Sequence, residues 1–150
     1  MRPSITEQLD GMARIVRDVL GAHLDDAYAN DIATGVAVTL STLGASWQEV
    51  PAFQRWETGE IESLLREALP HLDASLAADV AGLERGAAAG ADPLDLRALD
   101  ARHTVARDLL ARAVPLIESD PALGAVRDGL HALARDRIAR YPLVAPRPRS

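Results

Sequence analysis

The chain contains no cysteine and no lysine among its 150 residues, and aromatic residues make up only 3% of it. Without cysteine there can be no disulfide, no thiolate zinc site and no cysteine nucleophile. A cysteine-free chain suits a reducing compartment, and no signal-peptide pattern follows Met1, so we expect a cytoplasmic protein. Without lysine, the segment from Gly86 to Gly90 cannot act as a phosphate-binding loop, which needs a Gly-Lys-Ser/Thr sequence.

Runs of β-branched residues are also scarce, whereas alanine and leucine dominate the 48% of residues that are apolar. Alanine and leucine favour helices, while strands are rich in β-branched and aromatic residues. A chain of this length forms one ordinary domain with a core of its own. We therefore predict an all-α, single-domain bundle of five or six helices over residues 1–141, followed by a Pro/Arg-rich tail over residues 142–150.

Charge is absent from the seventeen residues Ile32–Gln48, although a quarter of the whole chain is charged. A membrane span needs about 20 mainly apolar residues. This stretch is shorter and contains Thr34, Thr39 and Thr42, so we expect no membrane partner. A helix that is apolar on every side is usually buried. We predict that most of this stretch forms the central helix of the bundle, which extends over about Ala27–Leu43 and ends at Gly44.

Capping signals and prolines predict where the other helices begin and end. Ser4 and Glu7 have the spacing of a capping box, in which each side chain accepts a hydrogen bond from the backbone N–H of the other. Pro51 favours a loop or a broken helical turn over residues 47–56, so the third helix is predicted to begin at Thr58. The remaining boundaries are predicted at Pro70, Asp73, Asp92-Pro93, Ile117, Asp120-Pro121 and Pro142.

Three of the five aromatic residues, Trp47, Phe53 and Trp56, lie within ten residues, with Arg55 beside them. One interpretation is structural: the rings fill the end of the bundle where the chain turns. The other is functional: tryptophan and arginine are frequent anchors at protein interfaces. We predict Trp47, Phe53, Arg55 and Trp56 as partner-binding residues if the second interpretation holds.

Two Asp-x-x-His pairs, Asp100 with His103 and Asp128 with His131, suggest an alternative metal site. Dimetal helical bundles hold their ions with a carboxylate and a histidine three residues apart on facing helices. The chain has 22 acidic residues, however, so an acid near a given histidine is common by chance. His103 lies on an apolar stripe and is also compatible with a hydrogen-bonded core histidine. We predict no cofactor from these pairs alone.

Other catalytic and nucleic-acid signatures are missing. No Gly-x-Ser-x-Gly sequence is present, which excludes the nucleophile elbow of α/β-hydrolases. The net charge is −6, with arginines spread along the chain, which disfavours a nucleic-acid partner. We therefore expect a non-catalytic interaction protein whose partner is either a different protein or a second copy of this chain, bound through an apolar helix face. We keep two alternatives. One is a metal- or ligand-binding bundle, and the other is a small-molecule binder with a pocket beside the two tryptophans.

Three segments resemble a family of small helical bacterial proteins of unassigned function, encoded beside aminoglycoside-phosphotransferase-like kinases and acyl-CoA dehydrogenases. The segments are Arg2-Pro3 with the helix Ile32–Leu40, Leu76–Gly86, and Leu130–Ala139 with Tyr141-Pro142. The stretch from about Asp92 to Asp120 looks like an additional helix that this family usually lacks. The resemblance implies an accessory subunit that supports a kinase acting on hydroxyacyl-CoA compounds and does not itself bind the nucleotide.

Overall fold

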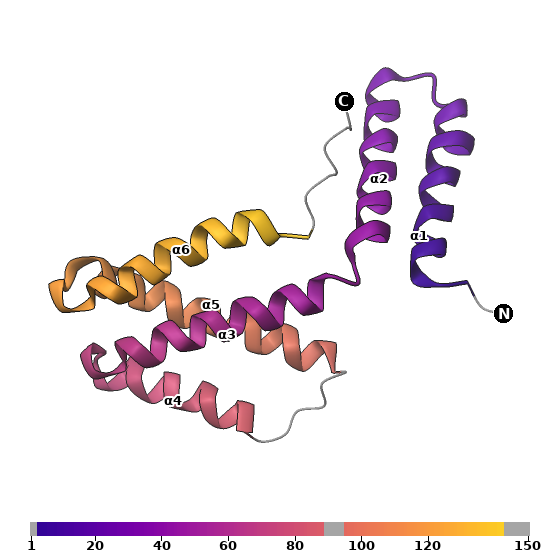
Figure 1. Cartoon of the computed structure of the whole chain (residues 1–150). Helices are drawn as coiled ribbons and strands as arrows, with labels where there is room; N and C mark the ends of the chain where they lie inside the picture. The colour runs from indigo at the N-terminus through magenta and orange to yellow at the C-terminus, as the bar shows by residue number, and fades with distance from the viewer. Residues whose placement is uncertain (1–2, 89–94, 143–150) are drawn as a thin grey trace. The chain divides into compact units, whose positions relative to one another are not determined.

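The computed structural model describes residues 3–88 and 95–142. These residues form six α-helices and no strand, so the all-α class and the predicted number of helices are confirmed (Figure 1). The helices are α1 (Ile5–Arg14), α2 (Ala27–Ser46), α3 (Val50–Ala68), α4 (Ala74–Ala88), α5 (Leu96–Ser119) and α6 (Gly124–Arg140).

Side-chain caps fix several of these boundaries where the sequence predicts them. The Ser4 N–H donates to Glu7 Oε2 over 2.7 Å, and the Glu7 N–H donates to Ser4 Oγ over 3.2 Å. Asp73 accepts a hydrogen bond of 2.8 Å from the Leu76 N–H, and Asp120 accepts one of 2.8 Å from the Ala122 N–H. Each cap satisfies an N–H that the first turn of a helix leaves without a partner.

The predicted start of the third helix is wrong by about two turns, because α3 begins at Val50. Pro51 lies in its first turn, where a missing N–H removes no helical hydrogen bond. Pro115 lies inside α5, which continues to Ser119. The predicted cap Asp92-Pro93 lies outside the described residues, and Asp95 caps α5 instead. The predicted tail also lies outside the described residues from residue 143 onward.

The contacts between residues divide the chain into two compact units. One contains the described residues up to Val50 together with Pro142, and the other is Pro51–Tyr141. The first is a helical hairpin of α1 and α2, and we call it the hairpin. The second contains α3 to α6, apart from Val50, and we call it the four-helix unit.

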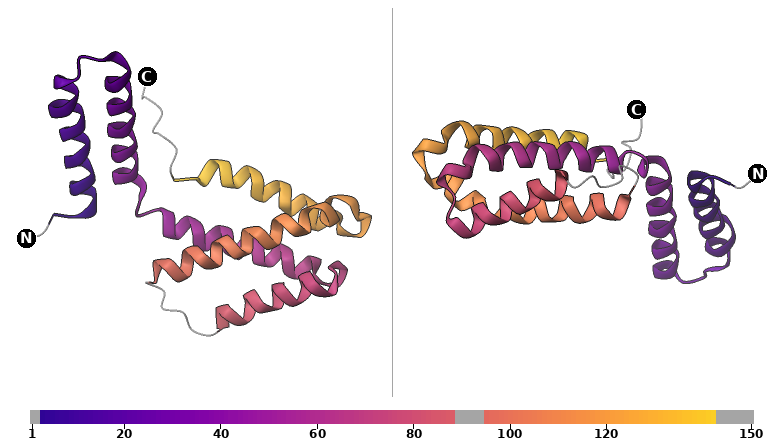
Figure 2. Two further views of the ribbon diagram at one scale, coloured as in Figure 1. Left: turned by 180° about the vertical axis from the view of Figure 1, so that it is seen from behind. Right: turned by 90° about the horizontal axis from the view of Figure 1, so that it is seen from below.

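The four-helix unit contains the main apolar core. Its four helices run alongside one another, and each contributes buried residues (Figure 2). Ile61, Leu65 and Ile117 are no more than 1% exposed, and Val80 is 2% exposed. The packed residues are Ile61, Leu64, Leu65, Ala68, Leu76, Val80, Leu83, Ala106, Leu109, Ala113, Ile117, Leu123, Val126 and Leu133.

In the hairpin, α1 continues through a π-helical turn (Ile15–Leu20) and a 3₁₀ turn (Gly21–His23) before α2 returns beside it. The two helices meet through small residues. Ala13 and Ala37 are 1% exposed, and a Cβ added at Gly44 would lie 3.4 Å from Leu9 Cβ. Small side chains let two helix backbones approach closely, so α1 and α2 pack with little apolar volume between them. None of the described helices is long and apolar enough to cross a bilayer.

Candidate interaction surface

Helix α2 is not the buried central helix that its uncharged sequence predicts. Of its residues, only Ala37, Gly44 and Ser46 are buried. Tyr28 is 74% exposed and Ile32 is 50% exposed. The prediction fails because α2 packs on one neighbour, α1, and a helix with one neighbour buries one stripe of its surface. The apolar side chains outside that stripe remain on the surface.

Most of the exposed apolar side chains of the two helices lie on the same side of the hairpin, and Val38 of α2 is an exception. On α1 they recur at helical spacing, on one side of the stripe formed by Leu9 and Ala13. On α2, Ile32 and Val36 lie on one side of the buried Ala37, and Ser41 lies on the other side. We call this surface the apolar face. Its residues are Ile5, Met12, Ile15, Val19, Leu20, Tyr28, Ile32 and Val36, all between 44% and 74% exposed.

The opposite side of the hairpin is polar. Glu7, Asp10, Arg14 and Arg17 of the α1 segment and Ser41 of α2 line a shallow cavity of about 430 Å³ there. The hairpin is thus amphipathic as a unit, since charge lies on one side and aliphatic side chains on the other. Large contiguous apolar surface on a folded unit marks a place where another surface binds.

The aromatic residues predicted as partner anchors are divided between the two units. Trp47 belongs to the hairpin and donates a hydrogen bond of 3.0 Å from its indole Nε1 to Thr6 Oγ1. Phe53 belongs to the four-helix unit, is 8% exposed, and lies 5.7 Å from the Trp56 ring centroid and 5.4 Å from that of Tyr141. These contacts favour the structural interpretation for Phe53, because a buried ring offers little surface to a partner.

Trp56 and Arg55 are more accessible. Trp56 is half-buried, and the Arg140 guanidinium lies 4.5 Å from its ring centroid. A cation over an indole face is attracted by the ring's quadrupole, so this contact ties the end of α6 to α3. Arg55 is exposed on α3. A partner-binding role for these two residues stays a prediction.

The structure does not bring the two Asp-x-x-His pairs together as a metal site. His131 Nε2 lies 3.0 Å from Glu118 Oε1 at the surface, and Asp128 is exposed. Asp100 accepts a hydrogen bond of 2.8 Å from Gln54 Nε2. Among the described residues, no three histidine, aspartate or glutamate side chains are placed to hold a metal ion. His103 faces a different acid, Glu57.

Glu57 is the centre of a buried polar cluster that the sequence did not reveal. Its carboxylate is 3% exposed and lies 2.5 Å from His103 Nε2 and 2.8 Å from Arg137 Nε. The residues come from α3, α5 and α6, and 46 positions separate Glu57 from His103. No local spacing could indicate this pair. A buried charge is tolerated when it is paired and hydrogen-bonded, so the cluster ties three helices together.

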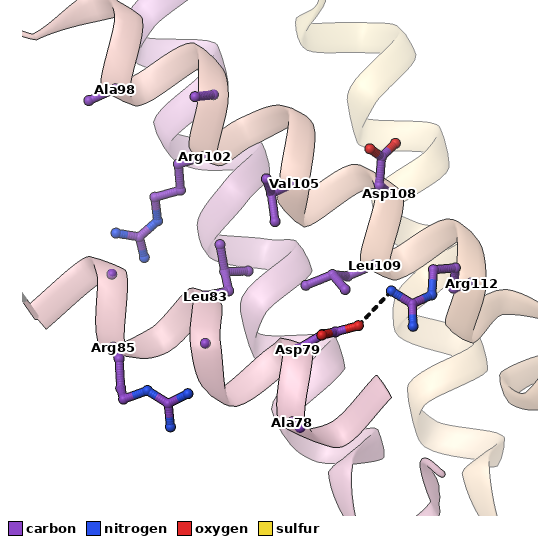
Figure 3. A pocket seen from close by; sticks show the side chains of 13 residues that line it. Ala78, Asp79, Leu83, Arg85, Ala98, Arg102, Val105, Asp108, Leu109 and Arg112 are labelled. Atoms are coloured by element: carbon purple, nitrogen blue, oxygen red, sulfur yellow. Dashed lines mark hydrogen bonds and ion pairs between the residues drawn. The ribbon is translucent and has the colours of Figure 1, made fainter. Parts of the chain in front are cut away.

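An open groove of about 790 Å³ runs between α4 and α5 (Figure 3). Leu83, Val105 and Leu109 line it, and arginine side chains surround it. Arg112 Nη1 lies 2.8 Å from Asp79 Oδ2, and this pair is half exposed. Arg102 lies 2.8 Å from Glu62 on α3. Neither tryptophan lines this groove, so the groove is not the predicted pocket beside the tryptophans.

No protein-family model, no curated protein and no solved structure matches this chain. The suspected family therefore remains an expectation from sequence resemblance. The structure contains two units: an amphipathic hairpin whose apolar face is exposed, and a four-helix unit that has its own core.

Proposed function

We propose that this chain is a non-catalytic interaction protein that uses the apolar face of its hairpin to bind another polypeptide. The observation that carries the proposal is the exposure of the apolar face, whose eight residues are at least 44% exposed. Burying apolar surface contributes about 25 cal/mol per Å². A complex with a partner that has a complementary apolar, helical surface is therefore more stable than the separate hairpin and partner.

The chemistry of the face narrows the class of partner. Helix α2 carries one charged residue, Asp31, and the apolar face carries none. A polyanion or a strongly charged peptide finds no opposite charge on this surface. The resemblance to accessory proteins of phosphotransferase-like kinases supports the same class of function. In that form of the proposal, the chain is the small partner subunit of a kinase that acts on hydroxyacyl-CoA compounds.

Co-expression with a kinase-like protein encoded beside its gene tests the kinase form of the proposal. We expect one complex in size-exclusion chromatography and a kinase activity that depends on this chain. Ile32→Asp should disrupt the complex, because it places a carboxylate in an apolar contact. Val38→Asp is the matched control, since Val38 is 52% exposed but lies outside the apolar face. Separate elution of the two proteins and unchanged kinase activity would contradict this form.

A second candidate function is small-molecule binding in the groove between α4 and α5. The groove favours it because its volume of about 790 Å³ lies within the usual range of ligand sites, about 300–1,000 Å³. Its apolar residues and surrounding arginines suit an apolar molecule with an anionic group. A thermal-shift screen with acyl-CoA compounds tests this candidate, because a bound ligand raises the unfolding temperature. Arg85→Ala should reduce the shift.

A further inference from the structure

We propose that a second copy of this chain covers the apolar face. In this dimer two hairpins pack face to face and form an intermolecular four-helix bundle. The inference rests on the proposed function, because it names the polypeptide that the apolar face binds. Two amphipathic helices bury only the stripe between them, whereas four can bury a common core.

The size of the face is sufficient for a dimer. A helix of about 20 residues is about 30 Å long. Two neighbouring helices with their side chains are about 20 Å wide, since helix axes pack about 8–10 Å apart. One whole side of the hairpin therefore measures about 600 Å², and two hairpins that meet over this side bury about 1,200 Å² in total, at the lower end of specific interfaces. We expect an affinity in the micromolar range rather than an obligate dimer.

The charges of the hairpin favour a second copy over a membrane surface. Between residues 3 and 50 the sequence has seven acidic residues and two arginines. Helices that lie on anionic bilayers usually carry many basic residues beside their apolar side. An acidic hairpin would be repelled by such a surface. In a face-to-face dimer the polar sides, with Glu7, Asp10, Arg14 and Arg17, point away from each other, so pairing brings no like charges into contact.

The acidic connection between the helices also favours one orientation. Asp25 and Asp26 lie between α1 and α2, and both are exposed. If the two connections were at the same end of the dimer, four carboxylates would lie near one another. With the connections at opposite ends, about 30 Å separates them, which exceeds the Debye length of about 8 Å at physiological salt. In this orientation α1 packs against α1 and α2 against α2, each pair antiparallel.

Sedimentation equilibrium of the full chain tests the dimer. At about 50 μM we expect a mass near twice the 16.0 kDa of one chain, falling towards one chain below about 1 μM. Ile32→Asp should weaken the association about 100-fold or more, because each copy then buries an unpaired carboxylate. Val38→Asp should leave the association within about twofold of the unmodified chain, since Val38 lies outside the face. A monomer at every concentration would overturn the inference.

A cysteine cross-link tests the orientation, and the cysteine-free chain makes each introduced thiol unique. Met12 lies near the middle of the α1 segment. With the connections at opposite ends, Met12 lies close to Met12 of the second copy. We expect Met12→Cys to form a disulfide-linked dimer on mild oxidation, whereas Val38→Cys should not. A dimer without this cross-link would overturn the proposed orientation.

Failure of this inference and failure of the proposed function give different results. If the chain is monomeric but a co-expressed kinase-like protein binds it and Ile32→Asp abolishes that binding, the second copy is wrong and the proposed function stands. If Ile32→Asp changes neither self-association nor any complex, both are wrong. Binding to phosphatidylserine vesicles by the unmodified chain, lost in Ile32→Asp, would overturn the second copy in favour of a membrane surface.

Discussion

The hairpin and the four-helix unit contain similar apolar residues and use them differently. In the four-helix unit Leu65 and Ile117 are fully buried, because each helix has more than one neighbour. In the hairpin Ile32 and Val36 remain about half exposed, because α2 packs on α1 along one stripe of its surface. An uncharged, apolar stretch therefore indicates a helix that has apolar surface to bury against another helix. It does not indicate whether the same chain provides one.

The largest expected effect contrasts a core leucine with a residue of the apolar face. Leu65→Ala should lower the free energy of unfolding by about 2–5 kcal/mol at any protein concentration, because it leaves a cavity in a packed core. Ile32→Ala should cost less than about 0.5 kcal/mol in dilute protein, where the face is uncovered. Its cost should grow with protein concentration if a second copy covers the face. Urea unfolding at about 1 and 50 μM, followed by circular dichroism, measures both.

Equal losses of unfolding free energy for Leu65→Ala and Ile32→Ala in dilute protein would contradict this difference between the two units. That result would mean that the apolar face is already covered within one chain.

The next prediction concerns the buried carboxylate of the four-helix unit. Glu57→Gln should cost about 2–4 kcal/mol of folding free energy, because it removes the charge that pairs with His103 and Arg137 in a buried site. Asp79→Asn is the control, since its pair with Arg112 is half exposed and should contribute less than about 1 kcal/mol. Thermal unfolding of both variants gives the difference. Similar small losses would show that water reaches Glu57.

A smaller effect is expected where a glycine of α6 lies against a leucine of α3. A Cβ added at Gly129 would lie 2.8 Å from Leu64 Cδ2, whereas one added at Gly59 would have nothing within 4 Å. Gly129→Leu should therefore cost about 1–3 kcal/mol through overpacking. Gly59→Leu should gain up to about 0.8 kcal/mol from helix propensity. Chemical unfolding of the two variants measures the contrast, and a gain at both positions would show that the α3–α6 contact is loose.

The smallest effect is a pH dependence at the cap of the turn that precedes α6. The hydrogen bond from the Ala122 N–H, with a further contribution from His71, holds the pKa of Asp120 below its ordinary value of 3.8. A carboxylate with a lowered folded pKa stabilises the fold above its unfolded pKa, and this contribution is lost as the pH falls through the folded pKa. As the pH falls below about 4, Asp120→Asn should therefore lose less thermal stability than the unmodified chain. An NMR titration giving a pKa at or above 3.8 would contradict the prediction.

Local sequence signals predicted the helices well because their causes are local. The caps at Ser4, Asp73 and Asp120 each involve a side chain and a backbone N–H no more than three residues away. Such contacts depend on residues that are neighbours in the sequence, so the sequence indicates them directly. The same signals misplaced the start of α3, since Pro51 is compatible both with a loop and with a first helical turn.

The candidate site depends on tertiary contacts and could not be predicted in the same way. The sequence suggested Asp100 as the acid near His103, but the closest acid in space is Glu57, 46 positions away. The sequence predicted correctly that a helix begins at Ala27, but its prediction that this helix is buried was wrong. Periodicity identifies which residues share a helix face, while burial depends on how many neighbours that helix has.

The positions of the two tryptophans give each unit its own optical signal. Trp47 is hydrogen-bonded within the hairpin, and Trp56 lies under Arg140 in the four-helix unit. The chain has no other tryptophan. In Trp56→Phe the fluorescence reports on the hairpin alone, and in Trp47→Phe it reports on the four-helix unit alone. The order in which the two units unfold, and the effect of protein concentration on each, can therefore be followed in the intact chain.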